Sequence, residues 1–491
     1  MLIMMASTVA AAPPNVLLIA VDDLRPELNC YGVDGVHSPN IDRLAASGIR
    51  FDRAYCQQAV CGASRLSIMG GLYPTTTREQ SYHVKAWRTR NPHLVTMNQH
   101  FRENGFTTVG VGKVYHSTGG ADADQQNWDQ WVFVRPVVYV DPENLKHARS
   151  FSVHDPKTFR GALTEALDVS DDRYADGERA AKAVELLNKL ARSGERFFMA
   201  VGFSKPHLPF VAPKRYWDLY DRTQFRMPIN VGLPAGYPDY AANRTGWELK
   251  FYHDYEGTRP TDFSTTLNQR LLHGYAACTS YVDACLGRVL DELDRTGLAE
   301  NTIVVLVGDH GWKLGDHSSW SKHTNLECDT RVPLIMRIPG GEEHQVSPSL
   351  VELIDLYPTL CELTGIQTPS HCQGRSFATL FKTPRAQHRS SAYSSYPGAE
   401  GISEREASGM IDATPRRSPA IGMGHSVRFG NYRYSEWRPA PDQPATATVL
   451  TDLQADPGEE TNVIGLPEYV ATLKRARAIL NKRIQSARPL R

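Results

Sequence analysis

The sequence lacks an excess of charge of either sign and lacks an apolar run long enough to cross a membrane. It has 54 Lys and Arg residues against 54 Asp and Glu residues, so its formal net charge is zero. Bulk charge therefore gives no reason to expect nucleic acid or an anionic membrane as a partner. No stretch reaches the roughly 18 apolar residues that a membrane-spanning helix needs. Any affinity for an anionic ligand must come from local clusters of cations.

A disulfide framework is also missing, because the eight Cys residues are scattered along the chain. Cys278 and Cys285 lie seven residues apart on a predicted helix, a rise of about 10 Å, which is too far for a disulfide. We expect both in the core. Cys361 and Cys372 are close enough in sequence to pair across a loop, and the sequence leaves this open. Cysteine content does not fix the compartment.

The length and the first residues suggest how the chain is divided. A chain of 491 residues exceeds the roughly 250–300 residues that one core usually serves. Residues 1–12 are apolar and then small, without a basic start, and we interpret them as the remnant of a signal peptide. This interpretation predicts a periplasmic or secreted protein. The alternative is a disordered start on a cytoplasmic protein.

Four nearly continuous apolar runs are typical of strands that are buried on both faces of a parallel sheet. They are Val16–Val21, Thr107–Val111, Phe197–Val201 and Thr302–Val307. Helical patterns lie between them, at about Asp176–Arg192 and Asn268–Arg295, with Gly297 as the cap of the second. Alternating strands and helices predict an α/β sandwich around a large, mostly parallel sheet.

The pattern changes after about Pro384. Residues 394–424 are rich in Gly, Ser, Pro and charge, which favours a long exposed loop. Strand-like pieces follow at Ser426–Phe429 and Tyr432–Trp437, and a helix at about Pro467–Gln485 ends the chain, with Pro467 in its first turn. The sequence therefore predicts a main domain over 13–385 and a smaller α+β domain over 386–491.

Each of the four predicted strands is followed by polar residues. In chain order these are Asp22-Asp23, Lys113 to His116, Lys205 to His207, and Asp309-His310. Open parallel sheets bind ligands at the carboxyl ends of their strands. A single polar segment after a strand is more often a solvated turn, but four such segments in one chain indicate a functional site.

The residue types in this set indicate metal-assisted chemistry on an anion. Three carboxylates offer hard oxygen ligands for Ca²⁺ or Mg²⁺: Asp22, Asp23 and Asp309. Three cations can neutralise an oxyanion: Arg65, Lys113 and Lys322. Two imidazoles can move protons: His116 and His207. The Cys- and His-rich shell of a structural zinc site is missing.

The most specific local signal is Cys61-Gly62-Ala63-Ser64-Arg65, followed by Leu72-Tyr73-Pro74. The alternative interpretation, without a catalytic role, is a buried Cys before a helix turn. The run resembles the signature of the formylglycine-dependent sulfatases, in which Cys-x-Pro/Ala-x-Arg directs oxidation of the Cys to formylglycine. Asp22-Asp23 and Asp309-His310-Gly311 lie where that family has its metal ligands. The resemblance covers nearly the whole chain, and it implies an alkaline-phosphatase-like sandwich with a smaller C-terminal domain.

Within the sulfatases, several phrases resemble the iduronate-2-sulfatase group. They are Asp22 to Pro26, Gln57 to Cys61, Gly112 to His116, Lys205 to His207, and Asp309 to Trp312. Four features depart from the pattern. Ala63 replaces the commoner Pro, Gly70 stands where many members have Thr, His323 stands where the group tends to have Tyr, and the loop after Pro74 is only partly similar. The last two features bear on the substrate.

The resemblance implies a role for each site residue. The hydrated formylglycine at 61 is the nucleophile, and Asp309 accepts a proton from it. Arg65, Lys113 and His116 hold the hydrated aldehyde, and Lys113, Lys322 and the metal hold the sulfate. His207, with Lys322, protonates the leaving oxygen. The implied ligands of the ion, Ca²⁺ or alternatively Mg²⁺, are Asp22, Asp23, Cys61, Asp309 and His310. A formylglycine-generating enzyme is the implied maturation partner.

We therefore expect an exo-acting sulfatase for a 2-O-sulfated uronic acid. Arg78 and Arg88 are the candidates for binding the uronate carboxylate, because Arg suits planar carboxylates. Trp312 is expected to pack against the sugar, beside His323. The alternatives are a sulfatase for another sulfated polysaccharide, a phosphonate or phosphate ester hydrolase of the same superfamily, and a non-catalytic glycan-binding protein in which Cys61 is never oxidised.

Overall fold

The structure is a computed structural model that describes residues 13–487, except 82–83, 85, 153–154, 156, 229, 243–247, 257–263, 398–421 and 441. The predicted signal-peptide remnant at 1–12 lies outside these residues. Among the described residues, no helix is both long and apolar enough to cross a membrane.

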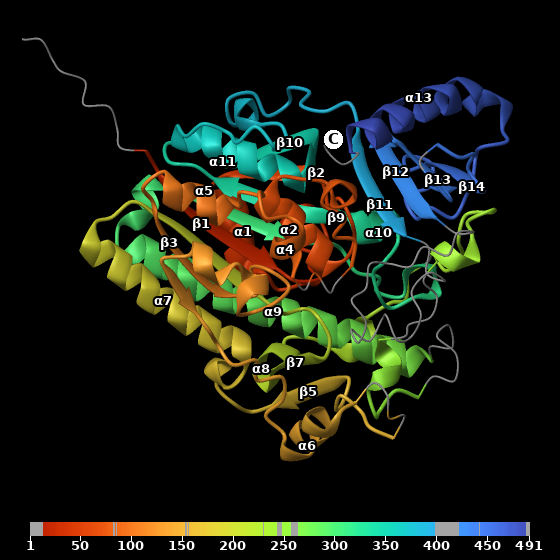
Figure 1. Ribbon diagram of the computed structural model, residues 1–491. Coiled ribbons are helices and arrows are strands. Elements are labelled where there is room, and N and C mark those ends of the chain that lie inside the picture. The colour runs from red at the N-terminus through yellow and green to blue at the C-terminus, as the bar shows by residue number, and fades with distance from the viewer. Residues whose placement is uncertain are drawn as a thin grey trace, which may run out of the picture.

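An eight-stranded sheet forms the centre of the molecule, in the order β10-β2-β9-β8-β1-β6-β3-β4 (Figure 1). The strands are β1 Asn15–Val21, β2 Ile49–Tyr55, β3 Thr107–Gly112, β4 Gln130–Val132, β6 Phe197–Phe203, β8 Thr302–Gly308, β9 Arg331–Arg337 and β10 Gln345–Glu352. Only β9 runs antiparallel to its neighbours, β2 and β8. The four predicted strands are confirmed, and as β8, β1, β6 and β3 they lie side by side and parallel.

Helices cover both faces of this sheet (Figure 1). Leu17, Ile19 and Val21 of β1 join one core with α1 Pro39–Ala46, α7 Ala175–Ser193 and α9 Thr265–Arg295. The alternate side chains Val16 and Leu18 join a second core with α2 Cys61–Gly70, α5 Met97–Glu103 and α11 Leu356–Thr364. The period-2 alternation of a strand thus divides its side chains between two cores.

The two long helices end close to where the sequence predicts. Ser264 caps α9, because its hydroxyl accepts a hydrogen bond from the Leu267 N–H at 3.1 Å. Beyond the other end, Gly297 takes the left-handed conformation (φ +73°) that glycine adopts readily. Cys278 and Cys285 are buried thiols in the core, as predicted, and Cys361 and Cys372 are also free thiols.

Shorter elements connect these layers. They are α3 Pro74–Thr77, α4 Trp87–Arg90, α6 Pro142–Ser150, α8 Lys214–Trp217, α10 Glu327–Thr330, and the paired strands β5 Thr164–Leu167 and β7 Phe210–Pro213.

A second, four-stranded antiparallel sheet follows in the C-terminal part of the chain. Its strands are β11 Ala392–Pro397, β12 Met423–Phe429, β13 Tyr432–Arg438 and β14 Ala447–Asp452, and α13 Val470–Ser486 packs on it after a 3-10 turn at Pro467–Tyr469. The predicted exposed loop over 394–424 is wrong at both ends, since Ser394–Pro397 and Met423–Gly424 are buried in strands. The small side chains of Ser394 and Ser395 allow close packing: the Ser394 hydroxyl donates to the Cys56 carbonyl, and the Ser395 N–H donates to the Gln57 carbonyl at 2.9 Å. Residues 398–421 of that predicted loop lie outside the described residues.

An ion pair and a hydrogen bond of the half-buried Glu327 tie the small sheet to the large one. Glu327 of α10 pairs with Arg433 of β13 and accepts a hydrogen bond from the Tyr55 hydroxyl at 2.7 Å. Burial opposes the charge on Glu327, but Arg433 and its neighbours lower the pKa of that carboxyl to about 2. Glu327 is therefore ionised across the physiological range.

Candidate active site

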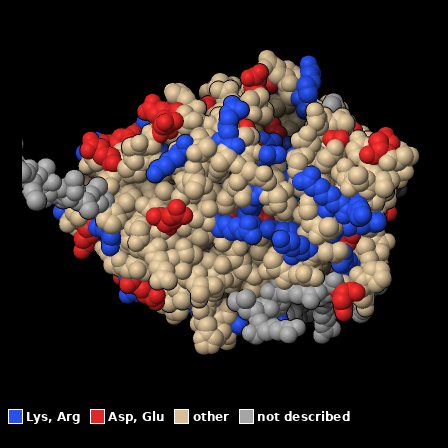
Figure 2. Space-filling view, turned by 90° about the horizontal axis from the view of Figure 1, so that it is seen from above, with Lys and Arg blue, Asp and Glu red and all other residues tan. Residues whose placement is uncertain are grey.

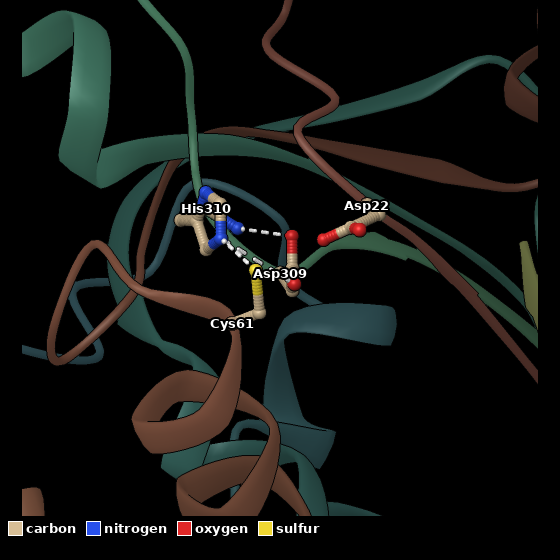
Figure 3. Close-up of side chains that lie close together, drawn as sticks. All are labelled: Asp22, Cys61, Asp309 and His310. Carbon is tan, nitrogen blue, oxygen red and sulfur yellow. Dashed lines mark hydrogen bonds and ion pairs between the residues drawn. The ribbon is translucent and has the colours of Figure 1, made fainter. Parts of the chain in front are cut away.

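The polar residues that follow the parallel strands meet at one edge of the large sheet. Asp22 and Asp23 follow β1, Lys113 follows β3, His207 lies four residues beyond β6, and Asp309 follows β8. Because these strands are parallel neighbours, their carboxyl ends lie together. Helix α2 begins at Cys61 and brings this residue to the same place (Figure 3).

Four side chains converge on one point. The potential ligand atoms of Asp22, Cys61, Asp309 and His310 all lie within 4.8 Å of one another, and all four residues are buried. Figure 3 shows His310 reaching Cys61 on one side and Asp309 on the other. The His310 Nε2 is 3.3 Å from the Cys61 Sγ and 3.6 Å from the Asp309 Oδ2. A second group joins Asp23 and Cys61 to His207.

Backbone contacts fix the carboxylates. The Asp309 Oδ1 accepts hydrogen bonds from the N–H groups of Asp23 at 3.2 Å and His310 at 2.9 Å. Asp23 has a left-handed backbone (φ +59°), which is uncommon for a residue other than glycine, and the Tyr275 hydroxyl of α9 donates to its carbonyl at 2.9 Å. The Ser64 hydroxyl donates to the Asp309 carbonyl at 2.5 Å. The site is therefore rigidly built.

Three buried cations face these carboxylates. Arg65, one turn after Cys61 on α2, donates from Nε to the Asp309 Oδ2 at 2.8 Å. The Lys113 Nζ pairs with the Asp22 Oδ2, and the Lys322 Nζ lies 2.6 Å from the Asp23 Oδ1. All three side chains are at most 12 % exposed. Burial disfavours their charge, but the carboxylates raise the pKa values of Lys113 and Lys322, so both remain charged.

The histidines of the site differ in protonation. Burial, together with the charge of Lys113, lowers the pKa of His116 to about 3. Burial and Lys322 likewise place the pKa of His207 well below its usual range. At His310, burial is outweighed by Asp309, which helps to raise the pKa to about 9. Near neutral pH, His116 and His207 are therefore neutral imidazoles that can accept a proton.

The donor set fits a divalent cation. Among the described residues, the buried Asp22 Oδ1 and Asp23 Oδ2 have no hydrogen-bond donor. An unsatisfied buried carboxylate oxygen is costly, and a bound cation removes that cost. Carboxylate oxygens are ligands that Ca²⁺ and Mg²⁺ prefer, and His310 would add one nitrogen, which has to lose its proton when the cation binds.

The residues predicted to bind the sugar are more dispersed. Arg88 lies 2.7 Å from the buried Asp124 and stacks over the Trp87 ring, so its guanidinium is already bound within the protein. Arg78 is exposed. The expectation that Trp312 faces the sugar is wrong for this structure, because the residue is only 1 % exposed. Its ring lies 5.0 Å from the Lys322 Nζ and supports that lysine. His323 lies against Tyr396 of β11.

Two residues at the site were missed by the sequence analysis. Glu248 is buried, and its Oε1 lies 3.8 Å from the His207 Nε2 and 3.4 Å from the Arg160 Nη1. The Arg160 guanidinium lies 5.2 Å from the rings of both Phe151 and Phe251. Neither Glu248 nor Arg160 belongs to a recognisable motif, so no signal in the sequence singles them out.

Comparison with known proteins settles the family. A family model described as Sulfatase matches residues 14–366. The chain belongs to the sulfatase family. It is a sulfuric ester hydrolase, and members of the family generally use a formylglycine and a divalent metal. This sulfatase is 33 % identical to the iduronate 2-sulfatase of Homo sapiens over 479 residues, which span 86 % of this chain and 84 % of the relative.

Solved structures confirm the alkaline-phosphatase-like fold. The sulfatase superposes on a phosphonate monoester hydrolase of Agrobacterium radiobacter with a TM-score of 0.73 at 23 % identity, covering 96 % of each chain. It superposes on a 2-O GAG sulfatase with a TM-score of 0.69 at 23 % identity, covering 97 % of this chain and 92 % of the other. At this identity the likeness concerns the fold alone.

Proposed function

We propose that this sulfatase removes the 2-O-sulfate from a terminal uronic acid of a sulfated carbohydrate, using formylglycine at position 61 and one Ca²⁺ ion, with Mg²⁺ as the alternative. The observation that carries the proposal is the convergence of Cys61 with buried carboxylates and cations at the start of α2. The similarity to an iduronate 2-sulfatase supports the substrate class.

Formylglycine has to be made before the chain folds, because Cys61 is only 2 % exposed and every residue of α2 is buried. We propose that a formylglycine-generating enzyme modifies the segment Cys61–Arg65 while it is still extended. When hydrated, the aldehyde supplies two hydroxyls on one carbon, one to attack the sulfur and one to expel the sulfate, which an ordinary Ser or Cys cannot do.

The chain's own residues prepare this nucleophile. Asp309 lies beside residue 61 and is placed to accept a proton from it. The Arg65 Nε donates a hydrogen bond to the Asp309 Oδ2 at 2.8 Å and so orients this carboxylate. His116, together with Arg65 and Lys113, holds the hydrated aldehyde. Lys113 and Lys322 are the charged groups that bind sulfate oxygens and stabilise their growing negative charge.

His207 is placed to deliver a proton to the leaving sugar oxygen. The His207 Nδ1 lies 2.7 Å from the Leu208 carbonyl, which can only accept a hydrogen bond. Nδ1 is therefore the protonated nitrogen of the neutral ring, and the Nε2 that faces the site, 3.9 Å from the Asp23 Oδ2, must take up a proton before it can donate one to the leaving oxygen. The charged Lys322 lies on the same carboxylate and is the group placed to supply that proton.

Five residues would hold the cation: Asp22, Asp23, Asp309, His310 and the modified residue 61. A bound Ca²⁺ would supply positive charge next to the sulfate oxygens.

A phosphonate or phosphate ester hydrolase is the second candidate, because the fold superposes on a phosphonate monoester hydrolase. The cluster of Lys113, His116, His207 and Lys322 favours sulfate. Comparing kcat/KM for 4-nitrophenyl sulfate and for a 4-nitrophenyl phosphonate monoester separates the two candidates, and we expect a preference for the sulfate of at least about 100-fold, or roughly 3 kcal/mol in the transition state.

A panel of sugars tests the substrate class. We expect sulfate release from an unsaturated or iduronate 2-O-sulfated disaccharide with a kcat/KM at least about 100-fold above that for 6-O-sulfated glucosamine, because only the uronate presents a carboxylate to a fixed cation. Ion chromatography of free sulfate measures both. Preference for the glucosamine would reject the uronate, and rapid loss of internal sulfates from an intact polymer would reject the exo mode.

Arg160 is the best-placed cation for the uronate carboxylate. Glu248 links it to His207, on the side where the leaving sugar is expected. Its guanidinium lies 5.2 Å from the rings of Phe151 and Phe251, and the side chain is 37 % exposed. The planar guanidinium of Arg suits a carboxylate. We propose Arg160 in place of Arg88 as its partner, with Arg78 as the second candidate.

Replacing Arg160 tests this assignment. Arg160→Ala is expected to raise KM for the 2-O-sulfated uronate by about tenfold, since a charged hydrogen bond is lost, and to change KM for 4-nitrophenyl sulfate less than about twofold. Arg78→Ala tests the second candidate in the same assay. Arg88→Ala is the contrasting variant, because it leaves the buried Asp124 unpaired and should lower the melting temperature instead. Equal KM changes on both substrates would mean that Arg160 does not bind the carboxylate.

A further inference from the structure

Outside the catalytic site, positive charge gathers on α13. The chain as a whole carries equal numbers of acidic and basic residues, yet Val470–Ser486 contains five cations and no acid. The cations are Lys474, Arg475, Arg477, Lys482 and Arg483. Such a local imbalance creates a positive potential that the balanced total conceals.

The packing of α13 directs most of this charge outward. Ala476, Leu480 and Ile484 are buried against the C-terminal sheet. Arg483 turns inward, where it pairs with Glu352 and donates to the Tyr73 hydroxyl at 2.5 Å. The other four cations are exposed and spread over about 12 Å of helix axis. Figure 2 shows the face that carries α13, on which Lys and Arg side chains gather into a band.

The C-terminal end of α13 lies against α3, in the segment that follows the nucleophile helix α2. The Thr75 hydroxyl of α3 donates to the Ala487 carbonyl, just after α13, at 2.7 Å. The exposed Arg78 follows α3 directly. Two residues later, the Gln80 carbonyl accepts a hydrogen bond at 2.7 Å from Gln58, which lies three residues before Cys61. Hydrogen bonds thus connect the C-terminal end of α13 with α3, and the chain just after Arg78 with the segment just before Cys61.

We propose that the exposed face of α13 binds the internal sulfated sugars of a polysaccharide whose terminal sugar occupies the catalytic site. The inference rests on the proposed function. A sulfated polysaccharide carries permanent negative charges at regular intervals, which matches a row of permanent cations. It is also the polymeric form of the proposed substrate, so a single ligand can occupy both the catalytic site and the α13 surface. The gain is a higher local concentration of chain ends at the site.

The test compares substrates of two lengths with a charge-neutralised variant. The triple variant Lys474→Gln, Arg475→Gln, Lys482→Gln keeps good helix formers at exposed positions, so the helix is retained. At low salt we expect it to lower kcat/KM for a heparin dodecasaccharide about tenfold, mainly through KM. For the 2-O-sulfated disaccharide we expect less than a twofold change. The wild-type advantage for the dodecasaccharide should also shrink as salt rises.

A matched control carries the same number of neutralised charges on another part of the molecule. Lys146→Gln, Lys189→Gln and Arg192→Gln change exposed cations of α6 and α7, away from α13 (Figure 1). We expect this control to behave like wild type with both substrates. An equal loss in the control, an equal loss on the disaccharide, or no loss on the dodecasaccharide would each overturn the proposal.

Binding without turnover separates this proposal from the function on which it rests. Fluorescence anisotropy of a labelled heparin dodecasaccharide should show about tenfold weaker binding by the α13 variant, in wild-type and Cys61→Ala backgrounds alike. A single-stranded oligonucleotide of equal charge should compete less well. Equal or tighter binding of the oligonucleotide would reject a sulfated-sugar surface. Weakened dodecasaccharide binding in a protein that does not cleave 2-O-sulfated uronates would leave the α13 surface standing and reject only the proposed substrate.

Discussion

Cys61→Ala is expected to lower kcat for 4-nitrophenyl sulfate by at least about 10⁴-fold, since removing a nucleophile removes the covalent route altogether. The side chain is small and lies at the first position of α2, so the variant should fold normally. Circular dichroism and the melting temperature check this.

Cys56→Ala is the matched control for this experiment. Cys56 is also a buried free thiol, five residues earlier in the same segment, but it lies outside the groups of ligand atoms at the site. Its replacement should leave kcat within about threefold of wild type, and any effect should fall on stability. Full activity in Cys61→Ala, or equal losses in both variants, would reject Cys61 as the source of the nucleophile.

Removal of the cation is expected to have the second-largest effect on sulfatase activity. Dialysis against a chelator should lower kcat/KM for 4-nitrophenyl sulfate by at least about 100-fold, because the sulfate oxygens lose their strongest positive partner. Ca²⁺ should restore the activity, since most of the ligands are carboxylate oxygens. The melting temperature should rise on adding Ca²⁺, because the ion binds the folded form and satisfies the buried Asp22 Oδ1 and Asp23 Oδ2.

The variant Asp22→Asn tests the same ion without a chelator. It removes one charge from the ligand set and should weaken Ca²⁺ binding at least about tenfold in equilibrium dialysis. Asp124→Asn is a suitable comparison, because Asp124 is equally buried but pairs with Arg88. Its Ca²⁺ binding should be unchanged. Stoichiometric zinc in the purified protein, with activity restored by zinc alone, would contradict the assignment.

Local patterns were sufficient to predict the centre of the fold and the core of the candidate site. Strands buried on both faces appear in sequence as continuous apolar runs, and β1, β3, β6 and β8 all do so. Parallel neighbours end at the same edge, so a residue's place after a strand predicts its neighbours in space. Asp22 and Asp309 meet for this reason, whereas Cys61, at the start of α2, was singled out by its resemblance to the sulfatase signature.

Contacts between residues far apart in sequence could not be predicted in this way. Whether Arg88 faces a sugar or a buried acid depends on Asp124, which lies 36 residues away in another segment. The sequence suggests that Trp312 packs against a sugar, yet the residue is buried and its ring lies next to the Lys322 ammonium. Glu248 meets His207 only through tertiary packing. Serine-rich Ser394–Pro397 forms a strand because β12 pairs with it, which composition cannot show.

The most direct test of the central claim is mass spectrometry of the peptide that contains Cys61, measured together with sulfatase activity across preparations matured to different extents. The account predicts a peptide in which the thiol has been replaced by an aldehyde, and a kcat that rises in proportion to the fraction of that form. Full activity in a preparation whose residue 61 is entirely unmodified cysteine would contradict it.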